Sequence, residues 1–194
     1  QMVHLDLQHG WPTDTIRDAC NAHLRPAPVS VLRAEAVPDH FDARRSAIRR
    51  DYLYRLLDRR SPPVLDRGRV WHLPFKVDVA AMHGAAQGLT GRHDFTTFRA
   101  SECQANSPDR TLDRLDVIRV AEEIHVHASA RSFLHSQVRS MVGSLVLVGR
   151  GTWKVPEIAR RLAAKDRSLC GALAPPEGLY LTGVGYPDEA LIPK

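Results

Sequence analysis

The sequence predicts an α+β fold in which helices pack on an antiparallel or mixed sheet. Apolar and polar residues alternate from Ile124 to Ala130, which is the period of a half-buried strand. From Phe133 to Val148 apolar residues recur at helical spacing instead. The predicted strands come in pairs with helices between them, which favours α+β over a regular alternation of single strands and helices. With 194 residues and 43% hydrophobic content, the chain can bury one sizeable core or two small ones that share an interface.

The first part of the chain is predicted to hold three strands and one helix. Residues 1–7 alternate as a strand does, and this strand starts at Gln1 without an initiator Met or a leading loop. We therefore expect it to be the remainder of something longer. A helix is predicted from Thr13 to Leu24, before two prolines, with strands over Val29–Val37 and Ile48–Leu57.

The second part begins at Ser61–Pro63, which break the pattern and form a candidate domain boundary. Asp78 is predicted to cap a helix, because its carboxylate can accept from the free N–H groups of a first turn. The remaining predicted elements are that helix, ending at Thr90–Gly91, a loop over Arg92–Arg110, a hairpin of Leu112–Val120 with Ile124–Ala130, helices over Phe133–Val148 and Pro156–Lys165, and a strand over Leu179–Tyr186.

The charge of the chain is basic and is carried by arginine. The net charge is +5 and the pI about 9.4, with nine of the arginines between residues 44 and 69. This cluster is typical of a surface that binds a polyanion, although a solvated charged face explains it equally well. No apolar run reaches the roughly 20 residues of a membrane span, and no signal peptide is recognisable, so a soluble, cytoplasmic protein is predicted. The three cysteines, an odd number and far apart, are predicted to be reduced thiols.

Motifs of the commonest enzyme classes are missing from the sequence. It contains no nucleophile elbow, no Walker loop and no dinucleotide glycine fingerprint. His125 and His127 share one strand face and could serve a metal-dependent nuclease, but no third or fourth ligand completes the pattern. We interpret them as polar residues on the exposed face of a hairpin, and the sequence calls for no metal and no cofactor.

Aromatic residues interleave with the arginine cluster. Tyr52 and Tyr54 project from the same strand face, and an aromatic ring amid phosphate-binding charge is how a protein holds an unstacked base. For Tyr54 we favour ordinary sheet packing. Arg139 interrupts an apolar helix, where a buried arginine needs a carboxylate partner. It could also simply face solvent.

Four segments follow one another along the chain: Phe41–Ala47 with Tyr52–Tyr54, Gly91–Arg99, Phe133–Gly143 and Ala174–Leu181. In this order they resemble four motifs of the TruA family of pseudouridine synthases, namely FHARxSA…YxY, the GxHDFTSFR loop, the FLHHMVRNIVG helix and the C-terminal APPEGLYL. Together they span nearly the whole chain.

The resemblance implies isomerisation of uridine to pseudouridine in the anticodon stem-loop of tRNA, without a cofactor. It implies the pseudouridine-synthase fold, with two similar halves and a central RNA-binding cleft. Residues 1–62 would be the remainder of the N-terminal catalytic half and residues 63–194 the C-terminal half. The partners implied are tRNA and a second copy of the chain in a homodimer.

The resemblance also implies roles for individual residues. An enzyme can act on such a base only when it is taken out of the stack, and Tyr52 is then the aromatic platform that receives it. Arg139 would be the catalytic arginine that keeps a carboxylate ionised. The substrate-binding residues implied are Tyr52, His135, Arg44, Arg49, Arg50, Phe95 and Arg99.

One departure concerns the nucleophile. The family's catalytic aspartate lies in a GRTDAGVH motif shortly before a strand that Gln1–Leu5 resembles, so we expect this motif upstream of Gln1 and expect the chain as given to be inactive. Asp42, where the family usually has His, is a conceivable substitute that nothing in its context supports. The alternative function is a non-catalytic basic RNA-binding fragment or paralogue, against which the retention of Tyr52 and Arg139 argues.

Overall fold

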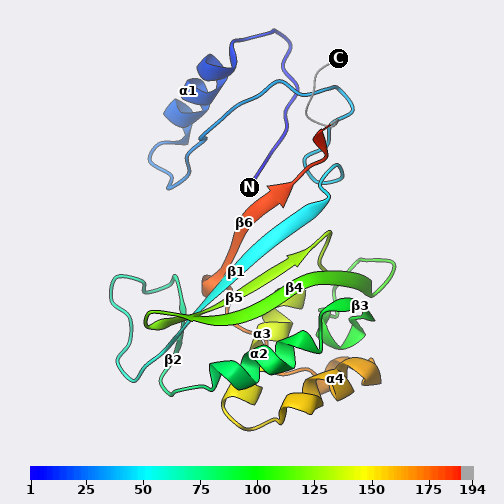
Figure 1. Cartoon of the computed structure of the whole chain (residues 1–194). Coiled ribbons are helices and arrows are strands. Elements are labelled where there is room, and N and C mark those ends of the chain that lie inside the picture. The colour runs from blue at the N-terminus through cyan, green and yellow to red at the C-terminus, as the bar shows by residue number, and fades with distance from the viewer. Residues whose placement is uncertain (189–194) are drawn as a thin grey trace. The chain divides into compact units, whose positions relative to one another are not determined.

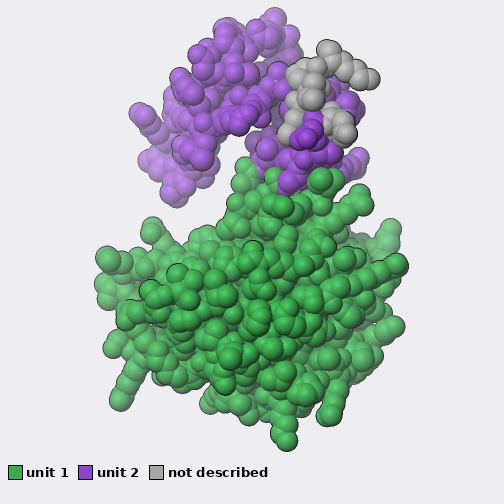
Figure 2. Space-filling model, viewed as in Figure 1, with its two compact units in different colours: residues 1, 48–184 green, residues 2–47, 185–194 purple. Residues whose placement is uncertain are grey.

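The computed structural model describes residues 1–188, and the chain divides into two compact units. Unit 1 comprises residue 1 and residues 48–184, and unit 2 comprises residues 2–47 and the chain from residue 185 on (Figure 2). These boundaries differ from the division at residue 62 that the resemblance implies.

Unit 1 is built on a mixed six-stranded sheet with the order β2-β1-β5-β4-β3, and β6 pairs with β1 outside that path (Figure 1). β1 and β2 run parallel, whereas β1–β5, β5–β4 and β4–β3 are antiparallel pairs. The strands are β1 Arg49–Asp58, β2 Trp71–Leu73, β3 Gly91–Asp94, β4 Asp109–Val120, β5 Glu123–Ala130 and β6 Leu179–Gly185.

Three helices cover one face of this sheet: α2 Val79–Gln87, α3 Gln137–Gly149 and α4 Val155–Ala164 (Figure 1). α3 is buried almost all round, because its residues are apolar or small on every side. Met141 and Leu145 of α3 join Val126 of β5 and Leu115 of β4 in one core, and all four are buried. Three short 3₁₀ helices, η1 Thr96–Phe98, η2 Arg167–Leu169 and η3 Pro176–Gly178, complete the unit.

The two faces of the sheet differ in character, as the alternation in the sequence predicts. On β5 the residues Ile124, Val126, Ala128 and Ala130 are buried on the helix side. Glu123, His125 and His127 alternate with them and are only half-buried. Among the residues described, no helix of unit 1 covers this second face.

Unit 2 contains the helix α1, Thr13–Leu24, which has no buried residue. The amide of Asn21 ties this helix to the following segment, accepting from Val31 N at 2.8 Å and donating to Val31 O at 2.9 Å. Phe41 is buried between the rings of His4 and Tyr186.

Most predicted elements are confirmed, including the helix from Thr13, the strand β1, the hairpin β4–β5 and the Asp78 cap, whose side chain accepts from Ala81 N at 2.9 Å. The strands predicted over residues 1–7 and 29–37 are wrong. A strand requires a hydrogen-bonded neighbour, and no described residue pairs with these two backbones in a ladder.

Two further differences concern local structure. The helix predicted from Phe133 begins only at Gln137, because Ser136 has a left-handed backbone with φ of 59°. The segment predicted as a loop over Arg92–Arg110 contains β3 and η1. No helix within residues 1–188 is long and apolar enough to cross a membrane.

Candidate active site

Tyr52 lies near the start of β1, opposite Ala128 of β5, on the face that the helices cover. It is half-buried and packs against the core. Its ring meets Phe133 edge to face, with the ring centroids 5.2 Å apart. Phe133 lies shortly after the end of β5, so this contact joins the segment before α3 to the start of β1.

Tyr54, two residues further along the same face, is fully buried. Its hydroxyl donates to the carbonyl of Pro175 at 2.6 Å. Burial raises the pKa of this hydroxyl well above its usual value, while the nearby positive charge of Arg139 opposes the rise. Tyr54 therefore remains a neutral donor at physiological pH, and the preference for a packing role is confirmed.

Arg139 projects from the first turns of α3 and is half-buried. Its Nε donates to the carbonyl of Ala174 at 2.7 Å, and the Ala174 N–H donates back to the carbonyl of Arg139 at 3.3 Å. Within residues 1–188 no carboxylate forms an ion pair with this guanidinium. The side chain is thus held through one nitrogen, and its two terminal nitrogens keep their capacity for an acidic group.

The segment that holds Arg139 can lie close to α3 only because residue 143 is glycine. A Cβ added to Gly143 would lie 1.8 Å from the carbonyl oxygen of Ala172. Gly178 is also constrained, since a Cβ there would lie 2.7 Å from the Arg55 carbonyl oxygen and 2.7 Å from the Tyr54 ring. Because they have no side chain, Gly143 and Gly178 allow residues 172–178 to pack directly against β1 and α3, which carry Tyr54 and Arg139.

A basic corner forms where the loop after η1 meets the start of α3. The carbonyl of His135 accepts from Ala100 N at 3.0 Å, which places Arg99 beside the exposed His135. Burial raises the pKa of the Cys103 thiol, but backbone N–H groups of Ala105 and His135 and the charges of Arg99 and Arg110 outweigh burial and lower it. The structure brings Arg99 and His135 together here.

Arg49 and Arg50 lie at the start of β1. Arg49 is exposed, and its Nε pairs with Asp51 at 3.0 Å. Arg50 lies opposite Ala130 and donates to the carbonyl of Arg131 at 2.6 Å. Because side chains alternate along a strand, Arg50 shares the face of Tyr52, whereas Arg49 lies with Asp51 on the opposite face.

Phe95 occupies a different environment from the one its predicted role suggests. It is fully buried, with its ring near those of His93 and Phe98. A fully buried ring in this position belongs to the core and fixes the loop around it. The predicted contact with substrate stays a prediction.

Arg44 belongs to unit 2, whereas Tyr52 and Arg139 belong to unit 1. It is exposed, and its backbone N–H donates to the Asp42 carboxylate at 2.8 Å, as does that of Arg45. These two N–H groups lower the pKa of Asp42. The carboxylate of Asp42 thus caps a turn, which explains why an acidic residue fits there.

His125 and His127 lie on the face of β5 that no helix covers. The Nε2 of His125 is 2.9 Å from Oε2 of Glu123, and the two imidazole centroids are 6.1 Å apart. In the described part of the chain no group of three or more His, Cys, Asp or Glu side chains is placed to hold a metal ion. His125 thus belongs to the network around Glu123, and His127 contacts the His125 ring.

Sequence reasoning missed the backbone partners of the site. The carbonyls of Ala174 and Pro175 hold Arg139 and Tyr54, but a carbonyl is present in every residue and carries no signal in the sequence. The one available signal was the Ala174–Leu181 motif itself, whose two prolines and one glycine mark a segment with a fixed path.

Comparison with known proteins supports the family that the sequence motifs suggest. The family model described as tRNA pseudouridine synthase matches residues 85–187. A protein of Methylobacterium nodulans named tRNA pseudouridine synthase A is 62% identical over 191 residues, covering 98% of this chain and 75% of its own length. Proteins of the same name from Mesorhizobium japonicum and Azorhizobium caulinodans are 59% and 57% identical, covering 96% and 97% of this chain and 76% and 73% of their own lengths. The chain therefore belongs to the TruA family of tRNA pseudouridine synthases.

Proposed function

We propose that this chain carries part of the active site of a tRNA pseudouridine synthase, which isomerises uridine to pseudouridine in the anticodon stem-loop of tRNA. The observation that supports this proposal most is how the Arg139 side chain is held. It is half-buried, fixed through Nε on Ala174, and without a carboxylate partner among residues 1–188. A protein that only binds RNA gains nothing from an arginine held in this way.

The proposed reaction needs an aromatic surface for the base and a carboxylate that stays ionised. The glycosidic N1–C1′ bond of uridine breaks, the uracil turns while it is still held, and C5 bonds to C1′. C5 loses a proton and N1 gains one, so the product is an isomer and the balance requires neither an electron acceptor nor a group donor. The base must leave its stack first, and an aromatic surface then holds it during the turn.

We assign the roles as follows. Tyr52 is the platform for the base, and Arg139 keeps the catalytic carboxylate ionised. Arg44, Arg49, Arg50, Arg99 and His135 contact the RNA backbone, and Phe95 anchors the loop that carries Arg99. In this proposal residues 1–62 belong to an N-terminal catalytic half and residues 63–194 to a C-terminal half, with the RNA in a cleft between them.

The carboxylate itself is not assigned to a residue of this sequence. The 194 residues contain no GRTDAGVH motif, and Asp42 already accepts hydrogen bonds from Arg44 and Arg45. We therefore propose that the 194-residue polypeptide does not catalyse the isomerisation by itself but still binds the anticodon stem-loop.

The test is a pseudouridylation assay on the 194-residue polypeptide, after its intact mass has been measured, with the Methylobacterium nodulans relative as the positive control. We expect no pseudouridine from a polypeptide of 21.7 kDa. Activity at that mass would overturn the assignment of the nucleophile, and Asp42→Asn would then show whether Asp42 supplies the carboxylate.

Binding is measured on the same sample, as affinity for an anticodon stem-loop RNA over a range of salt concentrations. Arg99→Gln should make the slope of log K against log salt shallower by about one, because one phosphate contact is lost. Arg160→Gln, at an exposed position of α4, is the matched control and should leave the slope unchanged. A polypeptide that neither binds this RNA nor isomerises it contradicts the proposed function.

A further inference from the structure

Arg167 lies outside the four sequence motifs, but the structure places it beside Arg99. It is the first residue of η2, and its Nη1 donates to the carbonyl of Thr97 at 3.3 Å. Thr97 belongs to η1, two residues before Arg99, and the next residue after Arg99 donates its N–H to the carbonyl of His135. The segment from η1 to residue 100 therefore brings Arg99, His135 and Arg167 to one corner of unit 1.

The backbone around Arg167 is fixed by the buried side chain of Thr97. The Thr97 hydroxyl donates to the carbonyl of Arg161 on α4 at 2.7 Å and accepts from Asp166 N at 3.1 Å. The Asp166 carboxylate in turn accepts from Ser168 N at 2.8 Å and caps η2. Arg167 therefore extends from a segment that is held against η1.

The three cations of this corner have no carboxylate partner. Within residues 1–188, Arg99, His135 and Arg167 form no ion pair. The carboxylate nearby is that of the exposed Glu102, whose pKa is lowered mostly by its own backbone N–H and the Ser101 hydroxyl and further by the charges of His135 and Arg167. Both charges therefore lie close to the same loop without being paired.

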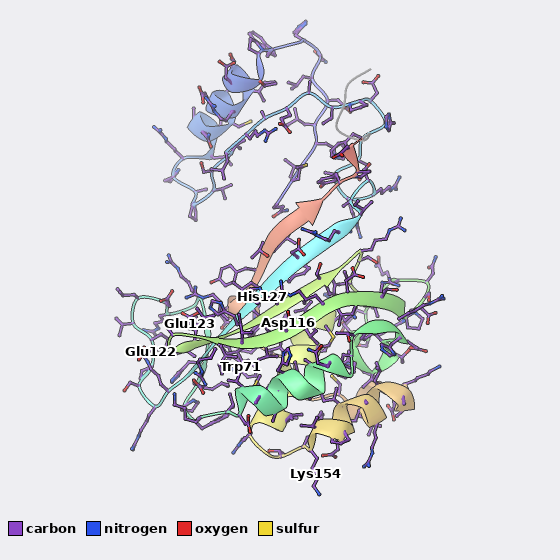
Figure 3. The ribbon with its side chains drawn as sticks, in the orientation of Figure 1. Trp71, Asp116, Glu122, Glu123, His127 and Lys154 are labelled. Carbon is purple, nitrogen blue, oxygen red and sulfur yellow. The ribbon has the colours of Figure 1, made fainter. Side chains whose placement is uncertain are left out.

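Arginines on the helix-free face of the sheet are held differently. Each of the following pairs with a carboxylate that Figure 3 labels: Arg55 with Glu123, Arg59 with Glu122 and Arg114 with Asp116. A polyanion gains little from an arginine that is already neutralised. An unpaired cation gives up no carboxylate when it binds a phosphate, so the corner of Arg99 is better suited to RNA than that face.

We propose that Arg167 binds a phosphate of the RNA, as a third cation beside Arg99 and His135. With Nη1 on the Thr97 carbonyl, its Nε and Nη2 form no other hydrogen bond within residues 1–188 and can donate to phosphate oxygens. This inference rests on the proposed function, because it extends the RNA-binding surface from the segment before α3 onto η2.

The test measures the affinity of the 194-residue polypeptide for the anticodon stem-loop RNA over a range of salt concentrations. Arg167→Gln should make the slope of log K against log salt shallower by about one, because one phosphate contact is lost. Arg167→Lys keeps the positive charge and should keep the wild-type slope.

Arg150→Gln is the matched control. Arg150 is an exposed arginine that directly follows α3, whereas His135 precedes this helix, and a helix of 13 residues separates the two by about 20 Å. This variant loses the same charge and should keep the wild-type slope. Circular dichroism checks that every variant is folded.

Each result decides the question. Arg167→Gln with the wild-type slope overturns this inference, even if its affinity is lower, and leaves the proposed function intact. An equal change of slope in Arg167→Lys or in Arg150→Gln overturns it as well, because the effect would then come from a lost backbone contact or from net charge alone. A wild type that does not bind the RNA at any salt concentration contradicts the proposed function and this inference with it.

Discussion

At the scale of the residue, the candidate site depends on how Arg139 is held. Its Nε donates to the carbonyl of Ala174 at 2.7 Å, and no other side-chain hydrogen bond of Arg139 is found within residues 1–188. A guanidinium anchored in this way has a fixed direction, and a fixed charge stabilises a nearby carboxylate more than a mobile one does. The position of residues 172–174 against α3 is therefore part of the site.

Gly143→Ala should disturb this arrangement directly. The new Cβ would lie 1.8 Å from the carbonyl oxygen of Ala172, which is backbone and cannot swing aside, so residues 172–174 must move off α3. We expect a loss of roughly 1–3 kcal/mol in the free energy of unfolding, the usual cost of overpacking. Urea denaturation followed by circular dichroism measures it.

Gly84→Ala is the matched control for this substitution. Gly84 also lies inside a helix, α2, but the nearest atom to its added Cβ is Cγ1 of Val155 at 3.8 Å. Here alanine should stabilise the protein by about 0.5–1 kcal/mol through its higher helix propensity. If both variants show the same stability, residues 172–174 are not pressed against α3 as described.

At the scale of the element, one buried carboxylate joins three parts of unit 1. Asp58 is the last residue of β1 and is fully buried. Both of its oxygens accept hydrogen bonds from the guanidinium of Arg119 on β4, one of them at 2.8 Å, and Val77 N, just before α2, donates to it at 3.3 Å. Burial opposes the charge of Asp58, but these donors and Lys76 outweigh burial and lower its pKa.

Asp58→Asn should therefore destabilise unit 1 by roughly 3 kcal/mol at neutral pH, the lower end of the cost of breaking a buried pair. Asp116→Asn is the control, because its partner Arg114 is largely exposed and the pair contributes less than about 1 kcal/mol. Urea unfolding of both variants and wild type at several pH values supplies the comparison.

The dependence on pH has a definite sign. The pKa of Asp58 is lower in the folded chain than in the unfolded one, so its contribution is complete above the unfolded value of about 3.9 and is lost as pH falls through the folded value. The difference between wild type and Asp58→Asn should shrink only in this acid range. A difference that is constant from neutral pH to strong acid would show that the Asp58 charge contributes nothing.

The elements also show which features can be predicted from sequence. Helices and the β4–β5 hairpin are local, so periodicity and the Asp78 cap are enough to predict them. The strands expected over residues 1–7 and 29–37 failed because alternation states which side chains could be buried, not whether a partner strand exists. The left-handed Ser136, which delays the start of α3, has no signal in a sequence of ordinary residues.

In the candidate site, too, local features can be predicted from sequence and contacts between distant segments cannot. Tyr52 and Arg139 could be singled out because an aromatic within a basic strand and an arginine within an apolar helix are each unusual. The burial of Phe95 and the backbone contacts of residues 174 and 175 depend on distant segments meeting, which one sequence without relatives does not reveal.

At the scale of the whole molecule, the two units differ in how much they bury. Unit 1 contains nearly all of the core, whereas Phe41 and Ala47 are the only buried hydrophobic residues within residues 2–47. α1 has no buried residue, and a 12-residue helix is marginal in water without tertiary packing. Local stability increases with the buried apolar area, so we expect the backbone of unit 2 to unfold locally far more readily than that of unit 1.

Hydrogen exchange followed by mass spectrometry should show this difference within the intact chain. We expect the amides of α1 to exchange far faster than those of α4, which is a surface helix of similar length but is anchored by the buried Ile158 and Leu162. The amides of α3 should be the slowest of the three, because this helix is buried on nearly every side.

Protection of α1 equal to that of α4 would contradict the prediction and would mean that another polypeptide surface covers α1 in solution. Measuring the exchange of α1 at low and high protein concentration would then separate a second copy, whose protection rises with concentration, from a contact within the chain, whose protection does not.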